Sequence, residues 1–67
     1  MISISETKKQ REDGESKYTL MELRGLSTDE KPTEINNTKI DNGSVFIEID
    51  TGKVYMFDLE NAQWGEI

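Results

Sequence analysis

The chemistry open to this 67-residue chain rests mainly on carboxylates, because it contains neither His nor Cys. Glu48, Asp50 and Asp58 could exchange protons near neutral pH only if burial or a neighbouring negative charge raised their pKa. Asp50 and Asp58 stand at the ends of expected strands, where Asp usually forms turns. Asp41 could join these two around a cation, but the spacing is not that of a calcium-binding loop. We therefore predict that the protein is not an enzyme and has no metal site and no cofactor.

A phosphate site at Gly52-Lys53 is a further possibility, since a Gly-Lys pair ends the Walker phosphate loop. The Walker pattern needs Gly-x-x-x-x-Gly-Lys at the start of a helix. Here the pair belongs to Asp50-Thr51-Gly52-Lys53, which has the composition of a hairpin turn with Gly at a positive φ. We therefore predict a turn at this position.

Four aromatic residues near the C-terminal end could form a platform on which nucleic-acid bases stack. Such platforms lie in basic grooves, whereas this part of the chain is acidic. The aromatic residues therefore belong to a core or to a subunit interface. A chain this short buries only about 60% of its unfolded surface and has no disulfides, so a second copy is the expected source of cover. The predicted self-association interface consists of Phe46, Tyr55, Phe57 and Trp64.

The segments that position these side chains are predicted strands of an all-β fold. Residues 44–49, 54–59 and 63–67 are rich in β-branched and aromatic residues, which predicts a three-stranded antiparallel meander. In the expected register Ile47 faces Met56, and Phe57 faces Trp64. One sheet face then carries Val45, Ile47, Ile49, Val54, Met56 and Ile67. The other face carries the four aromatic residues, so both faces are apolar and both need cover.

The N-terminal part is divided at residue 17. Residues 1–17 are predicted to form a polar arm or one strand of a hairpin, and residues 18–67 a single small β domain. Asp13-Gly14 is a hairpin turn signal that would place Ile4 opposite Leu23, which adds one or two strands to the meander. Residues 25–43 form a long connection, which is either a binding element or a passive crossover between parts of the sheet.

Residues 43–64 resemble a hairpin module of small bacteriophage proteins and of phage head and tail-fibre components. The resemblance lies in Asp50-Thr51-Gly52-Lys53 followed by Val54-Tyr55-Met56-Phe57-Asp58, with Trp64 a few residues later. The stretch from Leu26 to Thr33 matches a segment that sometimes precedes this module. The resemblance implies a phage or prophage protein whose hairpin serves structural and subunit-contact purposes.

The charge of the chain is unevenly distributed. The net charge of −6 lies entirely within residues 18–67, which hold ten acidic and four basic side chains. Such a surface repels nucleic acid and anionic membranes and attracts basic proteins. The predicted acidic partner-binding surface comprises Asp29, Glu30, Glu34, Asp41, Asp50 and Asp58.

The predicted function is protein binding by a homo-oligomer, with a dimer favoured. The partner is either a phage structural protein, which makes the chain a virion accessory protein, or a host defence protein such as a nuclease or helicase that the acidic chain would inhibit. No apolar run approaches the roughly 20 residues of a membrane span, and the N-terminus is too polar for a signal peptide. We therefore expect no membrane and no direct nucleic-acid partner. The expected location is the host bacterial cytoplasm or the phage particle, without secretion.

Overall fold

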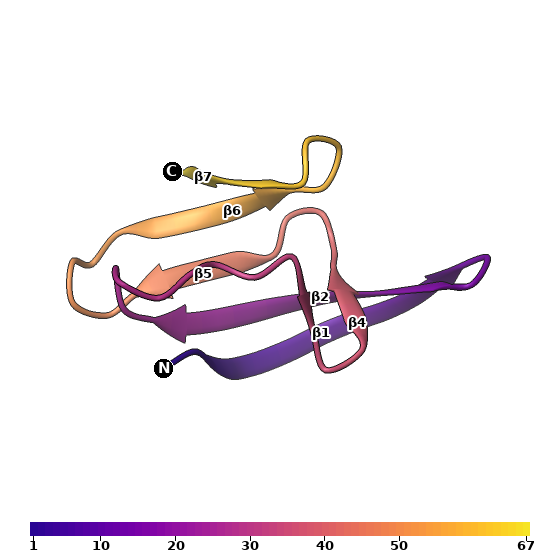
Figure 1. The fold of residues 1–67 in the computed structure, drawn as a ribbon, viewed down its shortest axis with the longest axis horizontal. Helices are drawn as coiled ribbons and strands as arrows, with labels where there is room; N and C mark the ends of the chain where they lie inside the picture. The colour runs from indigo at the N-terminus through magenta and orange to yellow at the C-terminus, as the bar shows by residue number, and fades with distance from the viewer.

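Every regular element of the structure is a β-strand, which confirms the predicted all-β class. The structure is a computed structural model that describes residues 1–67 (Figure 1). Its strands are β1 Ser3–Asp13, β2 Ser16–Gly25, β3 Glu34–Ile35, β4 Thr38–Ile40, β5 Val45–Glu48, β6 Val54–Asp58 and β7 Gln63–Glu66. The chain contains no helix with the length and apolar character needed to cross a membrane.

One mixed sheet joins the seven strands and curls into a half-barrel. The strand order is β3-β4-β2-β5-β6-β7, and β1 pairs with the remaining edge of β2 (Figure 1). β2 pairs in parallel with β4 near its start and with β5 near its end. The long connection after Gly25 permits this pairing, because it leads the chain through the β3–β4 hairpin and back alongside β2. The sheet is therefore not antiparallel throughout.

The N-terminal hairpin is paired along its whole length. β1 and β2 run antiparallel from the turn at Gly14 as far as Ser3, and Ile4 lies opposite Leu23 as predicted. Two register shifts, the first between Ile4 and Glu6, interrupt the ladder and bend β1. The boundary predicted at residue 17 falls inside β2, so the polar segment and the rest of the sheet share one strand.

The register between β5 and β6 differs from the prediction. Ile47 lies opposite Val54 and not opposite Met56. The turn between the strands is longer than predicted: the Gly52 amide donates a 2.8 Å hydrogen bond to the Glu48 carbonyl oxygen, and Gly52 has a φ of 75°. The longer turn moves the pairing by two residues. Because a shift of two preserves the alternation along a strand, each side chain stays on its predicted face.

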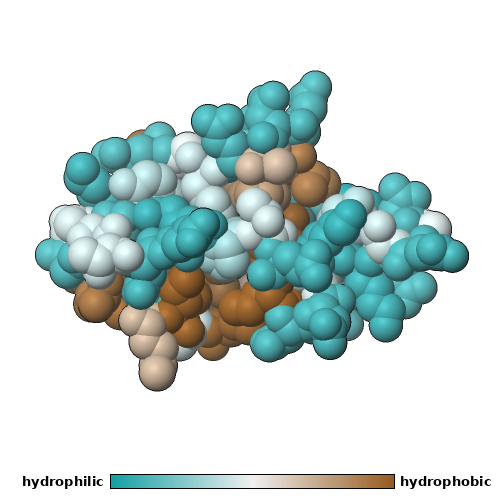
Figure 2. Space-filling model, viewed as in Figure 1, coloured by the Kyte–Doolittle hydropathy of each residue, from teal (hydrophilic) through white to brown (hydrophobic).

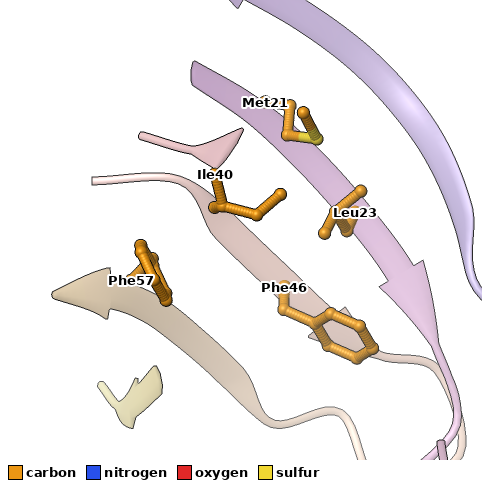
Figure 3. Packing of buried hydrophobic residues seen from close by; sticks show 5 residues of the cluster. All are labelled: Met21, Leu23, Ile40, Phe46 and Phe57. Carbon is orange, nitrogen blue, oxygen red and sulfur yellow. The ribbon is translucent and has the colours of Figure 1, made fainter. Parts of the chain in front are cut away.

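The hydrophobic core lies on the concave side of the half-barrel. Its buried side chains come from β2, β4, β5 and β6 and are Met21, Leu23, Ile40, Phe46 and Phe57 (Figure 3). Alternate residues of β2 point into this core and end at Gly25, where an added Cβ would lie 2.8 Å from the Phe46 ring. Hydrophilic residues cover most of the surface seen in Figure 2, but apolar residues reach the surface along its lower margin.

Candidate functional site

The structure gathers the four aromatic residues on one face but covers that face within a single chain. Phe46 is 0% exposed and Phe57 is 2% exposed. Trp64, opposite Phe57 as predicted, packs edge-on against Phe46 with ring centroids 5.9 Å apart. Its indole N–H donates a 2.8 Å hydrogen bond to the Pro32 carbonyl oxygen. The cover that we expected from a second copy is thus supplied by the connection between β2 and β3, and the buried aromatic rings are core residues.

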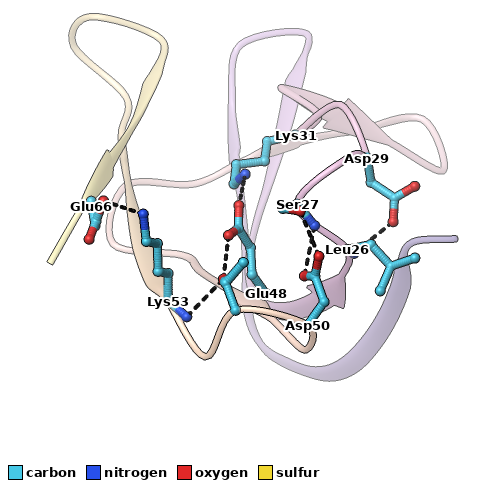
Figure 4. Close-up of polar contacts among 9 residues, drawn as sticks. Leu26, Ser27, Asp29, Lys31, Glu48, Asp50, Lys53 and Glu66 are labelled. Atoms are coloured by element: carbon cyan, nitrogen blue, oxygen red, sulfur yellow. Dashed lines mark hydrogen bonds and ion pairs between the residues drawn. The ribbon is translucent and has the colours of Figure 1, made fainter.

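A partly buried ion pair holds this connection in place. The Lys31 ammonium lies 4.9 Å from the Phe46 ring centroid and 4.2 Å from that of Tyr55. It donates a 2.6 Å hydrogen bond to Glu48, which also accepts one from the Thr51 hydroxyl (Figure 4). These two bonds lower the pKa of Glu48, a residue that is only 3% exposed. Glu48 therefore remains ionised at neutral pH and acts as an anchor for Lys31.

Two of the predicted acidic surface residues anchor the same connection. Asp50 accepts hydrogen bonds from the Ser27 amide at 2.9 Å and the Ser27 hydroxyl at 2.6 Å (Figure 4). Asp29 accepts a 2.8 Å bond from the amide of Leu26. The hydrogen bonds from Ser27 and Leu26 lower the pKa of Asp50 and Asp29 respectively. These carboxylates therefore hold a loop of their own chain.

The other predicted acidic residues lie elsewhere on the molecule. Asp41 accepts two hydrogen bonds from the Arg11 guanidinium, at 2.9 and 3.0 Å, and this interaction with Arg11 lowers its pKa. Asp58 closes the turn after β6 by accepting a 2.8 Å bond from the Asn61 amide group. Glu30 and Glu34 are exposed. No group of three or more acidic side chains is arranged to hold a metal ion.

The convex side of the sheet carries a second set of apolar residues, which we call the outer apolar face. In the ladder Val45 lies opposite Met56, and Ile47 lies opposite Val54. Ile67 continues the second row, since its amide donates to the Val54 carbonyl oxygen at 2.9 Å. The outer apolar face comprises Leu20, Val45, Ile47, Ile49, Val54, Met56 and Ile67. The sequence pattern indicated all but Leu20, but favoured the aromatic face as the interface.

Much of the outer apolar face is in contact with solvent. Ile49 is 64% exposed, Met56 45% and Ile67 74%. The remaining members are half-buried by their neighbours in the sheet. Scattered apolar residues are normal on a protein surface, whereas a contiguous apolar group is a candidate interaction site. The sequence pattern favoured the aromatic face because it did not reveal that the loop covers that face.

The larger of two surface cavities has a volume of about 380 Å³ and lies between the β1–β2 hairpin and the β3–β4 turn. That turn contains Asn36 and Asn37, both with positive φ. Glu12 is the sole carboxylate in the cavity lining, so the cavity lacks the pair of carboxylates that most glycoside hydrolases use. The outer apolar face is therefore the stronger candidate for a functional site. Comparison with protein-family models, curated proteins and solved structures finds no match to this chain.

Proposed function

We propose that this chain is a non-enzymatic, phage-encoded protein-binding module that works as a homo-oligomer, most simply a dimer, and serves as an accessory structural protein of the virus particle. The observation that carries the proposal is the outer apolar face. An antiparallel hairpin sheet with one solvated face normally alternates apolar and polar residues, whereas β5 and β6 place Val45, Ile47, Val54 and Met56 on the convex side. Such a face is stabilised when another protein covers it.

The state of the carboxylates supports a role without catalysis. An acid or base that works near neutral pH needs a raised carboxyl pKa. Glu48, Asp50 and Asp41 all have lowered pKa values, because each accepts hydrogen bonds from a neighbouring side chain. Their geometry supports a structural function, in which ionised carboxylates hold the loop and the hairpin.

The phage assignment rests on the resemblance of residues 43–64 to phage hairpin modules. The residues that carry it form the turn between β5 and β6, where Thr51 bonds to Glu48 and Gly52 adopts a positive φ. Mass spectrometry of purified particles, from a phage that encodes the chain, tests the virion role. Peptides of the chain at a stoichiometric level in washed particles are expected. Their absence from particles of a strain that expresses the chain would overturn the virion role.

The competing function is inhibition of a host nuclease or helicase by the acidic surface. The structure makes this less favourable, because Asp29, Asp41 and Asp50 are occupied by hydrogen bonds within the chain. Fewer carboxylates then remain to imitate the phosphates of nucleic acid. Phage growth on hosts with and without a nuclease-based defence system separates the two functions. Loss of growth only on the defended host, after deletion of the gene, would favour inhibition.

A further inference from the structure

We propose that the outer apolar face packs against the same face of a second copy, so that two sheets stack with a two-fold axis running across their strands. This inference rests on the proposed function as a homo-oligomer and assigns its interface. The axis passes between two adjacent rows of the ladder. The first row is Glu22, Val45, Met56 and Gly65, and the second is Arg24, Ile47, Val54 and Ile67.

The two rows complement each other in size and charge. The proposed axis places the first row of one chain over the second row of its partner, which brings Val45 over Ile47 and Met56 over Val54. Gly65 then lies opposite Ile67, and the space beyond Gly65 is open, since an added Cβ there would have no atom within 4 Å. A large apolar side chain of the partner can therefore enter the gap that glycine leaves.

The charged end of each row supports the same arrangement. Glu22 and Arg24 lie on the outer side of β2, with Arg24 Nη2 and Glu22 Oε2 3.7 Å apart. In the proposed dimer Glu22 of each chain faces Arg24 of the other, so the charged end of each row gains an attractive pair. Elsewhere two copies repel, because the chain carries a net charge of −6. Glu6 of β1 is paired with Glu22, but the Glu22–Arg24 pair is complementary to its own copy, which favours a second copy over a basic partner.

The sheet edges are less suited to association than the face. β7 has four residues and β3 has two, which leaves little ladder for another strand to extend. The free edge of β1 is long, but it carries two register shifts and many charged side chains. Short strands, bulges and charges are the usual means by which edges resist pairing. Contact through the face is therefore favoured over strand addition.

The size of the face predicts a weak dimer. Four strands about 4.8 Å apart, with about six residues along them at about 3.3 Å each, give a footprint of about 300 Å² per chain. Stable complexes bury about 800 Å² per partner, and smaller contacts are transient. We therefore expect exchange between monomer and dimer at chain concentrations from about 10 µM to about 1 mM. Assembly in a particle would raise the local concentration of the chain.

Sedimentation velocity over this concentration range tests the assignment. The wild-type mass should rise from the 7.7 kDa of one chain toward twice that value. Met56→Lys should weaken association at least tenfold, although it reduces the net negative charge of each chain. Gln10→Lys makes the same charge change on β1, away from the face, and should leave association unchanged. Far-UV circular dichroism would verify that both variants are folded.

A charge exchange tests the orientation. Arg24→Glu should weaken the dimer, and adding Glu22→Arg to the same chain should restore it, because the exchanged pair again faces opposite charges. A short bismaleimide linker provides a second test, since the natural chain has no cysteine. A mixture of Val45→Cys and Ile47→Cys chains should form a mixed cross-linked dimer in higher yield than either variant alone.

The outcomes separate this inference from the proposed function. A dimer that Met56→Lys leaves intact would overturn the interface while leaving a homo-oligomer in place. A dimer that is weakened by Met56→Lys, but without rescue by the charge exchange, would overturn the two-fold arrangement. A monomer at all concentrations would overturn both self-association claims and leave the face to a different protein.

Discussion

Replacing Gly25 with alanine should destabilise the protein, because the end of β2 passes directly over the core. An added Cβ would lie 2.8 Å from Cζ of Phe46, 3.0 Å from an Asp29 carboxylate oxygen and 3.3 Å from a side-chain carbon of Ile2. Phe46 has little room to move. It is fully buried, Trp64 packs against its ring, and the Lys31 ammonium lies on the ring as well.

The expected cost follows from this crowding. Ordinary contacts of a Cβ begin near 3.4 Å, so relief requires a displacement of at least about half an ångström by the ring or by β2. Overpacking of this kind in a tight core costs about 1–3 kcal/mol. A domain of this length has a free energy of unfolding of only about 3–10 kcal/mol. The melting temperature should therefore fall by roughly 5–20 °C.

Thermal unfolding followed by circular dichroism measures the effect at low chain concentration, where monomers dominate. Gly65→Ala is the matched control, because no atom lies near its added Cβ and Gly65 does not have a positive φ. It should leave stability unchanged or raise it slightly. Adding Phe46→Leu to Gly25→Ala removes the opposing ring atom. The double variant should therefore lose less stability than the sum of the losses of the two single variants. Wild-type stability for Gly25→Ala, or strict additivity in the double variant, would refute the packing argument.

Three further predictions concern polar groups. The folded-state pKa of Glu48 lies below its ordinary value of 4.5, so its ionised form stabilises the fold above that pH, and this contribution is lost as the pH falls through the folded pKa. Urea midpoints should decline more steeply below about pH 5 in wild type than in Glu48→Gln, and parallel curves would contradict this. Ser44→Ala should cost about 1–3 kcal/mol in chemical denaturation, because the buried Ser44 hydroxyl oxygen accepts the Met21 amide; an unchanged midpoint would show that the amide finds another acceptor. In thermal melts Trp64→Phe should cost about 1 kcal/mol through the lost bond to Pro32, and Trp64→Ala about 3 kcal/mol because the packing of the ring is lost as well; equal losses in the two variants would contradict the packing contribution.

The parts of the fold that sequence analysis predicted depend on local signals. A short turn after Asp58 places Phe57 opposite Trp64, because the length of the turn sets the register of the strands it joins. Ile4 lies opposite Leu23 as predicted, but only because the two register shifts in β1 change by two residues the register that the turn at Gly14 sets. The turn at Gly52 is longer than predicted, so the register of β5 and β6 differs from the prediction by two residues. The hydrogen bonding of this turn cannot be deduced from composition alone.

The parts that could not be predicted depend on contacts between distant segments. The parallel pairing of β2 with β5 requires the connection after Gly25 to return along β2, and no local sequence signal in that connection predicts its path. The position of Lys31 depends on Glu48 and Tyr55, which lie 17 and 24 residues further along the chain. The sequence predicted the interface on the aromatic face because it did not show that a distant loop covers that face. The loop is mostly polar and carries no hydropathy signal.

A loop of the same chain covers the aromatic core, so a partner chain is not needed to cover it. Because Lys31, Asp29 and Asp50 fix the connection over the aromatic core, that core is covered within one chain. The acidic side chains that suggested a binding surface serve in part to hold that cover. The aliphatic convex face lies outside that core. Association through it can therefore be weak and reversible in solution, and still be effective where many copies are held close together.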